Sequence, residues 1–443
     1  MSPILFVGIA LFLFSAFFYF FELHVPVTIF HIPFSLASLL LALSGVCAIL
    51  SIYKNGFSRP QKEFFMAYRN VFLCACLLSI ALTLPIFIFL HGKLLIDYFF
   101  RAFFNMAALF LVTYYGSTYA FFPRALFFLF ALPGIAYIPF LYLTDTFPSL
   151  LNQSNYFFKG PTLNTTYWGI FLTIGILYIF AHFVFLSRGW KKTVLFIIFS
   201  FLLGMLMWAG SRATFLGLFF GFLYIVWNMH NRFSHKGTYF LKMAGTIFFA
   251  VILGFLLIPR PAKLVLLSRF NRNAAVTLVH ARFDWKTGAP MPKSVLNGIA
   301  VKKDFFIPQE NRALSDTGRF ELWRLAWGVF KKNIFGYGIG YTHVVAFDNG
   351  GLWLKGVHNI FFEVLVMGGI AALCAFLALC FQFFKNAFFN RKKSAFSIVS
   401  YAALFAVLIA FIFSDGISIR WFWMLLGLCL VLERFWQESD SMV

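Results

Sequence analysis

Residues 192–229, KTVLFIIFSFLLGMLMWAGSRATFLGLFFGFLYIVWNM, contain two apolar runs with almost no loop between them. Each run is long enough for a helix to cross a hydrocarbon core of roughly 30 Å. Similar runs alternate with short polar breaks along the whole chain, which is 61% hydrophobic, more than a soluble domain of this size can bury. Barrel strands would be half as long and would alternate in polarity. The sequence therefore predicts an all-α polytopic membrane protein.

The same pattern predicts about twelve membrane-spanning helices. We place them near residues 4–22, 34–53, 71–91, 98–121, 124–143, 167–186, 192–209, 211–229, 239–258, 357–381, 395–413 and 416–434. The first lacks the charged segment and cleavage site of a signal peptide, so we expect it to remain as a spanning helix. The six cysteines all fall inside apolar runs and are expected to be packing residues.

The formal net charge of +21 comes from basic residues spread over many loops rather than gathered in one nucleic-acid-binding arm. With a cytoplasmic N-terminus, the short inner loops carry a series of basic residues and the short outer loops hold little beyond Lys93 and Lys159. Residues 259–356 are also rich in basic residues, but long loops translocate regardless of charge. This asymmetry predicts that both termini are cytoplasmic. The chain then divides into helices 1–9 (1–258), a large outer loop (259–356) and helices 10–12 with a short cytoplasmic tail (357–443).

The outer loop has two parts. Residues 259–312 are rich in Pro, Lys, Arg and Asn and are expected to be irregular. Residues 316–332 predict an amphipathic helix, because Phe320, Trp323, Trp327 and Phe330 recur at helical spacing. Asp316 is placed to act as its N-cap. The Trp-rich face suits the membrane interface.

Arg212 is the first candidate functional residue. It lies in Gly210-Ser211-Arg212-Ala213-Thr214, at the expected outer end of two helices. A guanidinium at membrane depth is costly unless it meets an anion or water, so such a residue is a functional candidate. The alternative is an arginine that extends to the lipid headgroups and only ends the helix.

Arg319 is the second candidate. It follows Asp316, Thr317 and Gly318 at the start of the amphipathic helix, where free backbone N–H groups and the helix dipole favour an anion. Its guanidinium would add a bidentate phosphate donor. A solvated residue or the partner of a nearby carboxylate would explain it equally.

His358 and Asn359 stand at the expected outer end of helix 10. A histidine with an ordinary pKa of about 6.5 can accept a proton from a hydroxyl near neutral pH. The alternative is a histidine that hydrogen-bonds backbone or water at a helix start. His343 is a second candidate with less support.

Other active-site patterns are absent from the sequence. There is no DxD, HExxH or GxSxG motif and no cysteine set with zinc-site spacing. Gly336-Tyr337-Gly338-Ile339-Gly340 follows no strand, so we interpret it as a flexible turn after the amphipathic helix rather than a nucleotide loop. Its glycines could also allow close backbone approach to a ligand.

These outer-face elements occur together and in order. Gly-Ser-Arg-Ala-Thr with Leu216 is followed by Asp-x-Gly-Arg with Trp323, then Gly-Tyr-Gly-Ile-Gly, then His358-Asn359 with Gly368. The ordered set resembles the O-antigen ligase and O-antigen polymerase superfamily of bacterial inner membranes. The likeness is detailed over roughly 200–370; elsewhere it rests on helix number and orientation.

The resemblance implies a GT-C-like glycosyltransferase that works at the periplasmic face without a metal or other cofactor. Its donor would be an undecaprenyl pyrophosphate-linked O-antigen, and its acceptor a sugar hydroxyl of lipid A-core. By motif position, Arg212 and Arg319 would hold the donor pyrophosphate and His358 would be the general base. Asn359, His343 and Asp316 are secondary candidates. Partners would be these lipids and the membrane, with no nucleic acid.

Three alternatives stay open. An O-antigen polymerase shares the donor chemistry, and a protein O-oligosaccharyltransferase shares it too. We favour the ligase because the chain has one dominant outer loop and the Arg-x-x-x-Leu and His-Asn elements typical of ligases. A lipid-linked glycan flippase or transporter would need charged residues at several depths. The charges within helices are few; Arg101 is the plainest, and Arg212, Asp415 and Arg420 lie nearer the outer ends.

Overall fold

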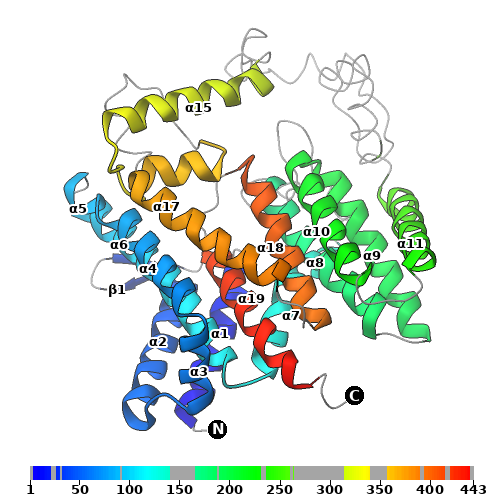
Figure 1. The fold of residues 1–443 in the computed structure, drawn as a ribbon, viewed down its shortest axis with the longest axis horizontal. Coiled ribbons are helices and arrows are strands. Elements are labelled where there is room, and N and C mark those ends of the chain that lie inside the picture. Colours follow the sequence, from blue (N-terminus) through cyan, green and yellow to red (C-terminus); the bar gives the residue numbers. More distant parts are fainter. Residues whose placement is uncertain are drawn as a thin grey trace, which may run out of the picture. The chain divides into compact units, whose positions relative to one another are not determined.

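The computed structural model describes residues 3–20, 26–29, 32–89, 92–139, 165–186, 189–230, 236–259, 263, 314–339, 357–389, 394–414 and 420–439. Within these residues the protein is helical apart from one antiparallel hairpin (Figure 1). The chain forms two compact units. Unit 1 comprises Met1–Leu129 and Thr317–Val443, and unit 2 comprises Phe130–Asp316. Unit 1 is therefore built from both ends of the chain.

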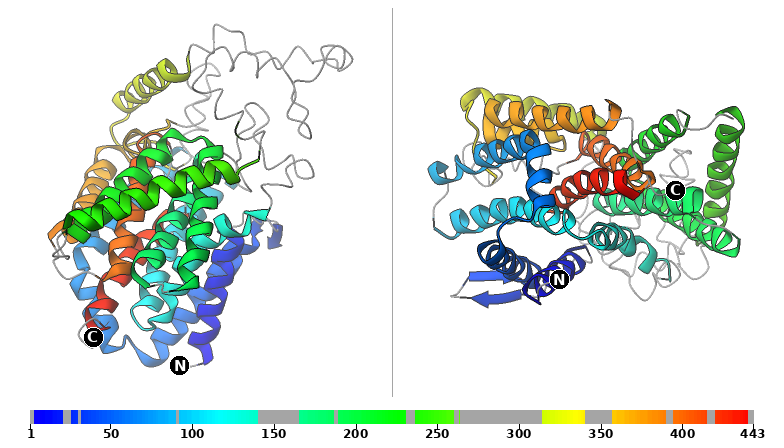
Figure 2. Two further views of the ribbon diagram at one scale, coloured as in Figure 1. Left: turned by 90° about the vertical axis from the view of Figure 1, so that its right-hand side faces the viewer. Right: turned by 60° about the horizontal axis from the view of Figure 1, so that its bottom comes forward.

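Unit 1 contains the hairpin and most of the helices. Its elements are α1 (Pro3–Phe20), β1 (Pro26–Ile29), β2 (Ile32–Ser35), α2 (Leu36–Asn55), α3 (Arg59–Ala67), α4 (Arg69–Thr83), α5 (Ile86–Phe89), α6 (Gly92–Gly116), the start of α7 (Phe121–Ala136), most of α15 (Leu314–Lys332), α17 (Ile360–Phe389), α18 (Ala395–Phe411) and α19 (Arg420–Ser439). Helix α1 packs on α2, α4 on α17, and α6 on α19. The β1–β2 hairpin connects α1 with α2 and lies beside them (Figure 2).

Buried polar side chains join three of these helices. The Tyr115 hydroxyl of α6 donates to the Ser44 carbonyl of α2 at 2.9 Å. The Ser44 hydroxyl in turn donates to the Gly8 carbonyl of α1 at 2.8 Å. In lipid every buried polar group needs a partner inside the protein, and small residues let helices approach closely. These contacts therefore fix α1, α2 and α6 against one another.

Unit 2 is a helical bundle. It contains the rest of α7, α8 (Thr165–Ala181), a π-helical turn (η3, His182–Leu186), α9 (Trp190–Ala209), α10 (Arg212–His230) and α11 (Lys236–Leu257). Helix α9 packs between α8 and α11. A Cβ added to Gly204 of α9 would lie 2.6 Å from the carbonyl oxygen of Gly254 in α11. The α9–α11 crossing thus depends on small residues, as is common in membrane bundles.

Six stretches among the described residues are long and apolar enough to cross a membrane: Pro3–Phe20, Leu36–Asn55, Arg69–Ile88, Thr166–Val184, Trp190–Ala209 and Ile360–Phe389. Shorter apolar helices cover Phe121–Ala136, Arg212–Asn228, Met243–Leu257 and Ala395–Phe411. Each segment predicted to span overlaps at least one observed helix, and the segment 71–91 overlaps two, α4 and α5. The number of spans, the external loop of 259–356 and the division at 258 and 356 remain predictions.

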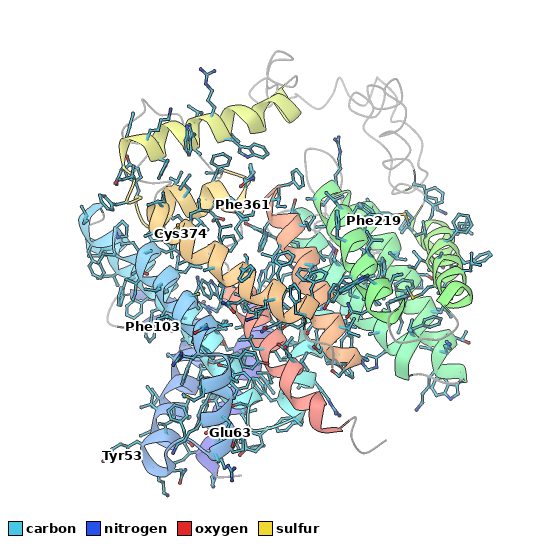
Figure 3. The ribbon with its side chains drawn as sticks, viewed as in Figure 1. Tyr53, Glu63, Phe103, Phe219, Phe361 and Cys374 are labelled. Atoms are coloured by element: carbon cyan, nitrogen blue, oxygen red, sulfur yellow. The ribbon has the colours of Figure 1, made fainter. Side chains whose placement is uncertain are left out.

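Large apolar side chains remain exposed on helices of both units. Phe103 of α6 and Phe219 of α10 are more than half exposed, and Phe361 of α17 also faces outward (Figure 3). Apolar surface on this scale is typical of helices that face lipid. The prediction of an all-α polytopic membrane protein is confirmed, with the small hairpin as the one β element among the described residues.

The structure departs from the sequence predictions in four places. The β1–β2 hairpin and α3 were not predicted. Helix α15 begins at Leu314, so Asp316 is its third residue, and the expectation that Asp316 is the N-cap is wrong. Helix α17 extends to Phe389 and is broken at Gly369, where φ is 64° and ψ is −160°.

Candidate functional site

The Arg212 turn of unit 2 is shaped by its neighbours in the motif. Helix α9 ends at Ala209, and Gly210 adopts a left-handed conformation with φ of 64°. Its N–H donates to the carbonyls of Leu206 and Met207 at 3.2 and 3.0 Å. Glycine suits this C-cap because it carries no Cβ. The chain can therefore reverse within two residues and start α10 at Arg212.

The other motif side chains are buried. Thr214 donates through its hydroxyl to the Ser211 carbonyl at 2.9 Å. A Cβ on Gly169 of α8 would lie 2.6 Å from Thr214 Oγ1, so α8 and α10 are in close contact there. Arg212, in contrast, is exposed. It is the first residue of α10, and its charge lies where the helix dipole attracts anions.

In unit 1, Asn359 has a structural role at the start of α17. It is buried, and its Oδ1 accepts from the backbone N–H groups of Phe361 and Phe362 at 2.9 and 3.2 Å. Its Nδ2 donates to the Ile412 carbonyl, just past the end of α18, at 3.0 Å. One side chain thus caps α17 and ties it to α18.

His358 is exposed and strained. It is the one non-glycine residue with positive φ (51°) among the residues that the structure describes. Side chains in the left-handed region are uncommon, and such strain concentrates at functional sites. In this conformation the His358 side chain is exposed just before the start of α17, whereas Asn359, the next residue, is buried.

The break in α17 is filled by the chain that follows α15. A helix broken at Gly369 leaves backbone groups without their usual partners. Residues 334–339 satisfy them with the hydrogen bonds Tyr337 N–H to Val366 O (2.9 Å), Gly338 N–H to Met367 O (2.6 Å) and Ile370 N–H to Ile334 O (3.1 Å). Ile339 N–H also donates to Leu82 O at 3.2 Å.

The glycines of this segment are therefore explained by contact with protein backbone. Gly336 and Gly338 have φ of 82° and 85°, and a Cβ on Gly369 would overlap the Ile334 carbonyl. The interpretation of residues 336–339 as a flexible turn is wrong, because they are bonded to α17 and to the end of α4. Gly340 lies outside the described residues.

Helix α15 contacts α17 close to His358. The Trp323 indole of α15 stacks on the Phe362 ring with centroids 6.0 Å apart and an interplanar angle of 24°. Arg319 lies one helical turn before Trp323 on α15. Its side chain, like that of Asp316, lies outside the described set, and His343 lies outside it entirely. Within unit 1, α15, which carries Arg319, therefore contacts the first turn of α17, just after His358 and Asn359. Arg212 belongs to unit 2.

Glu363 is a further polar residue of this region to which sequence reasoning assigned no role. It lies one turn after Asn359, it is 2% exposed, and its N–H donates to the Asn359 carbonyl at 2.8 Å. A carboxylate inside an apolar run is itself a functional signal. Among the described residues, no group of three His, Cys, Asp or Glu side chains could hold a metal ion.

Comparison with known proteins agrees with the ordered motifs. A protein-family model described as O-antigen ligase matches residues 195–377, a segment that includes the Arg212 turn, α15 and the first half of α17. No curated protein and no solved structure matches the chain. Over residues 195–377, less than half of its length, this chain is therefore similar to the O-antigen ligase family.

Proposed function

We propose that the protein is an O-antigen ligase of the bacterial inner membrane, with its active site facing the periplasm and both termini in the cytoplasm. It transfers O-antigen from undecaprenyl pyrophosphate to a sugar hydroxyl of lipid A-core during lipopolysaccharide biosynthesis. One observation supports the proposal most: Arg212 and His358 are both exposed, and each lies next to buried motif residues that fix its turn. Both residues lie within the segment that matches the family model.

Arg212 and Arg319 bind the donor pyrophosphate in this mechanism. Arg212 is the first residue of α10, where the helix dipole favours an anion. Arg319 is the sixth residue of α15, so the expectation that it lies at the free N–H groups of the helix start is wrong, and its proposed role rests on its guanidinium. Negative charge grows on the pyrophosphate as its bond to the sugar breaks. Two guanidiniums stabilise that charge through bidentate, charge-assisted hydrogen bonds, so the reaction needs no metal.

His358 is the general base. The acceptor oxygen attacks the anomeric carbon, the hydroxyl proton passes to the imidazole, and the carbon–oxygen bond to pyrophosphate breaks. Undecaprenyl pyrophosphate leaves with the bonding electrons. A positioned base contributes typically 10²- to 10⁴-fold, and holding two lipid-anchored substrates in line adds to this. Direct displacement inverts the donor's anomeric configuration, which NMR of the product tests: a retained linkage would refute it.

The decisive experiment is transfer between purified components in EDTA, with undecaprenyl pyrophosphate-linked glycan and lipid A-core. His358→Ala and Arg319→Ala should abolish transfer in folded protein. Arg324→Ala is the matched control for Arg319, because Arg324 is exposed on the same helix and outside the motif. If lipid A-core receives nothing while polyprenyl-linked chains lengthen, the protein is a polymerase. Unchanged transfer in His358→Ala would remove the assigned base.

A further inference from the structure

Unit 1 contains a buried arginine that is not one of the motif residues assigned to the reaction. Arg420 is the first residue of α19 and only 7% exposed. Its guanidinium lies 4.9 Å from the ring centroid of Tyr19 in α1 and 5.1 Å from that of Phe104 in α6. The Arg420 backbone N–H donates to the Tyr19 hydroxyl at 3.3 Å. Helices from both ends of the chain therefore enclose this charge.

The guanidinium has donors that the described protein does not satisfy. Nη2 donates to Ser38 Oγ of α2 at 3.0 Å. Nε and Nη1 have no hydrogen-bond partner among the described residues. Arginine stays charged in proteins, and a buried charge is tolerated only when an anion and hydrogen bonds compensate its lost hydration. Two unsatisfied donors on a buried guanidinium therefore point to an acceptor that binds there.

A second positive charge strengthens the case. Arg101 is on α6, one helical turn before Phe104, and it lies over the Tyr98 ring at 5.0 Å. Its charge acts unfavourably on that of Arg420. Two neighbouring cations repel each other, and a bound anion reduces that repulsion.

Carboxylates of the chain are the competing explanation. Glu433 is on the same helix, but thirteen residues further on, which is roughly 20 Å along the axis. Asp97, one turn before Arg101, and Asp415, five residues before Arg420, are the acidic residues nearby in sequence. Their side chains lie outside the described set, so both enter the experiment as controls.

We propose that Arg420 and Arg101 form a binding site for a phosphate group, carried by an anionic membrane lipid. Phosphate oxygens are strong acceptors for guanidinium N–H groups such as Nε and Nη1, and guanidinium–phosphate pairs are among the strongest hydrogen-bonded contacts. Tyr19, Ser38 and Arg420 all lie in the first or last turn of their helices. Helix ends lie at the depth of lipid headgroups, which favours a lipid over a free ion as the source of the phosphate.

Native mass spectrometry of the full-length protein in mild detergent tests this site. Phosphatidylglycerol is titrated against diacylglycerol, which has the same chains without the phosphate. The wild type should prefer phosphatidylglycerol, and Arg420→Gln should lower its affinity about tenfold or more. Arg69→Gln, an exposed arginine at the start of α4, is the matched control and should bind as the wild type does.

Competition identifies the source of the phosphate. If millimolar inorganic phosphate displaces the lipid, the site also takes free phosphate; if it does not, the site requires the lipid-borne group. Unchanged phosphatidylglycerol affinity in Arg420→Gln would overturn the proposal. A second outcome would also overturn it: Asp415→Asn or Asp97→Asn loses as much thermal stability as Arg420→Gln, and none of these variants changes the lipid affinity. The partner of Arg420 would then be that carboxylate.

Two further variants keep the test valid if Arg420→Gln does not accumulate. Arg420→Lys retains the charge but cannot supply the same planar set of donors, and Arg101→Gln removes an exposed charge. Both should weaken phosphatidylglycerol binding several-fold. Wild-type affinity in both would overturn the proposal. Glycan transfer is not the readout, so the result is independent of the proposed reaction.

Discussion

Replacing His358 with alanine and with glycine should separate stability from catalysis. His358 has φ of 51° and its side chain is exposed at the start of α17. Both substitutions remove the imidazole that we propose as the base. They differ in backbone freedom, because alanine keeps a Cβ in the left-handed region and glycine does not.

The expected difference in the free energy of unfolding follows from two opposing terms. The left-handed conformation costs a residue with a Cβ about 1–2 kcal/mol. Relative to alanine, glycine lowers the free energy of unfolding by about 0.4–1 kcal/mol, because it gives the unfolded chain more conformational freedom. His358→Gly should therefore be more stable than His358→Ala by about 1 kcal/mol. Both should lose 10²- to 10⁴-fold in transfer rate, the usual contribution of a positioned base.

The assay combines thermal unfolding in detergent with glycan transfer by the same preparations. A difference of 1 kcal/mol corresponds to roughly 2–4 °C in Tm for domains of 150–250 residues. Equal melting temperatures for the two variants would refute the left-handed conformation at His358. Transfer above a tenth of the wild-type rate in either variant would refute the assignment of His358 as the base.

Three further predictions concern Asn359, the break in α17 and the two candidate arginines. Asn359→Ala should lower the free energy of unfolding by about 2–4 kcal/mol, since it removes a helix cap and the donor to the part-buried Ile412 carbonyl. Asn359→Ser keeps an uncharged cap acceptor and should lose less; equal losses in thermal unfolding would show that the cap is unimportant. Gly369→Ala should lower the free energy of unfolding by at least about 2 kcal/mol, because the new Cβ would overlap the Ile334 carbonyl and because φ is positive at this position. Faster amide hydrogen exchange in residues 334–339 would show this loss. Arg212→Lys and Arg319→Lys should each lower kcat/KM at least about tenfold by losing bidentate phosphate contacts; wild-type kinetics in both would argue against a pyrophosphate role.

The helices were largely predictable because lipid imposes a simple rule on sequence. Every backbone group in a spanning segment must be satisfied within the helix, so long apolar runs can be assigned with little ambiguity. Helix α3 was missed although its signal was present. Ser58 and Gln61 form a capping box, with Pro60 in the first turn, and this pattern marks a helix start even in a polar stretch.

The sequence singled out candidate site residues but could not assign each of them a role. The order of the motifs singled out Arg212, Arg319 and His358, and composition alone could not say which motif residues are structural. Asn359 was a secondary candidate, and its contacts now explain it as a cap. The partner of the Gly336–Ile339 segment was unpredictable, because its hydrogen bonds depend on a break in α17 about thirty residues further along the chain.

Arg420 shows where sequence reasoning ends. From the sequence it was only one of the few charges expected within helices, near an outer end. Its burial between Tyr19 and Phe104 depends on contacts between residues far apart in the chain. No local pattern encodes such a contact.

The construction of unit 1 from both chain ends also sets an order for biogenesis. The helices before Leu129 leave the ribosome first, but their packing partners follow only after Thr317. At about 5–20 residues per second, synthesis of the intervening segment takes roughly 10–40 s. During that interval α4 and α6 lie in the bilayer without α17 and α19, so their polar residues are open to other helices and to quality-control proteases. Translation speed through unit 2 would then govern how much nascent protein reaches its folded state.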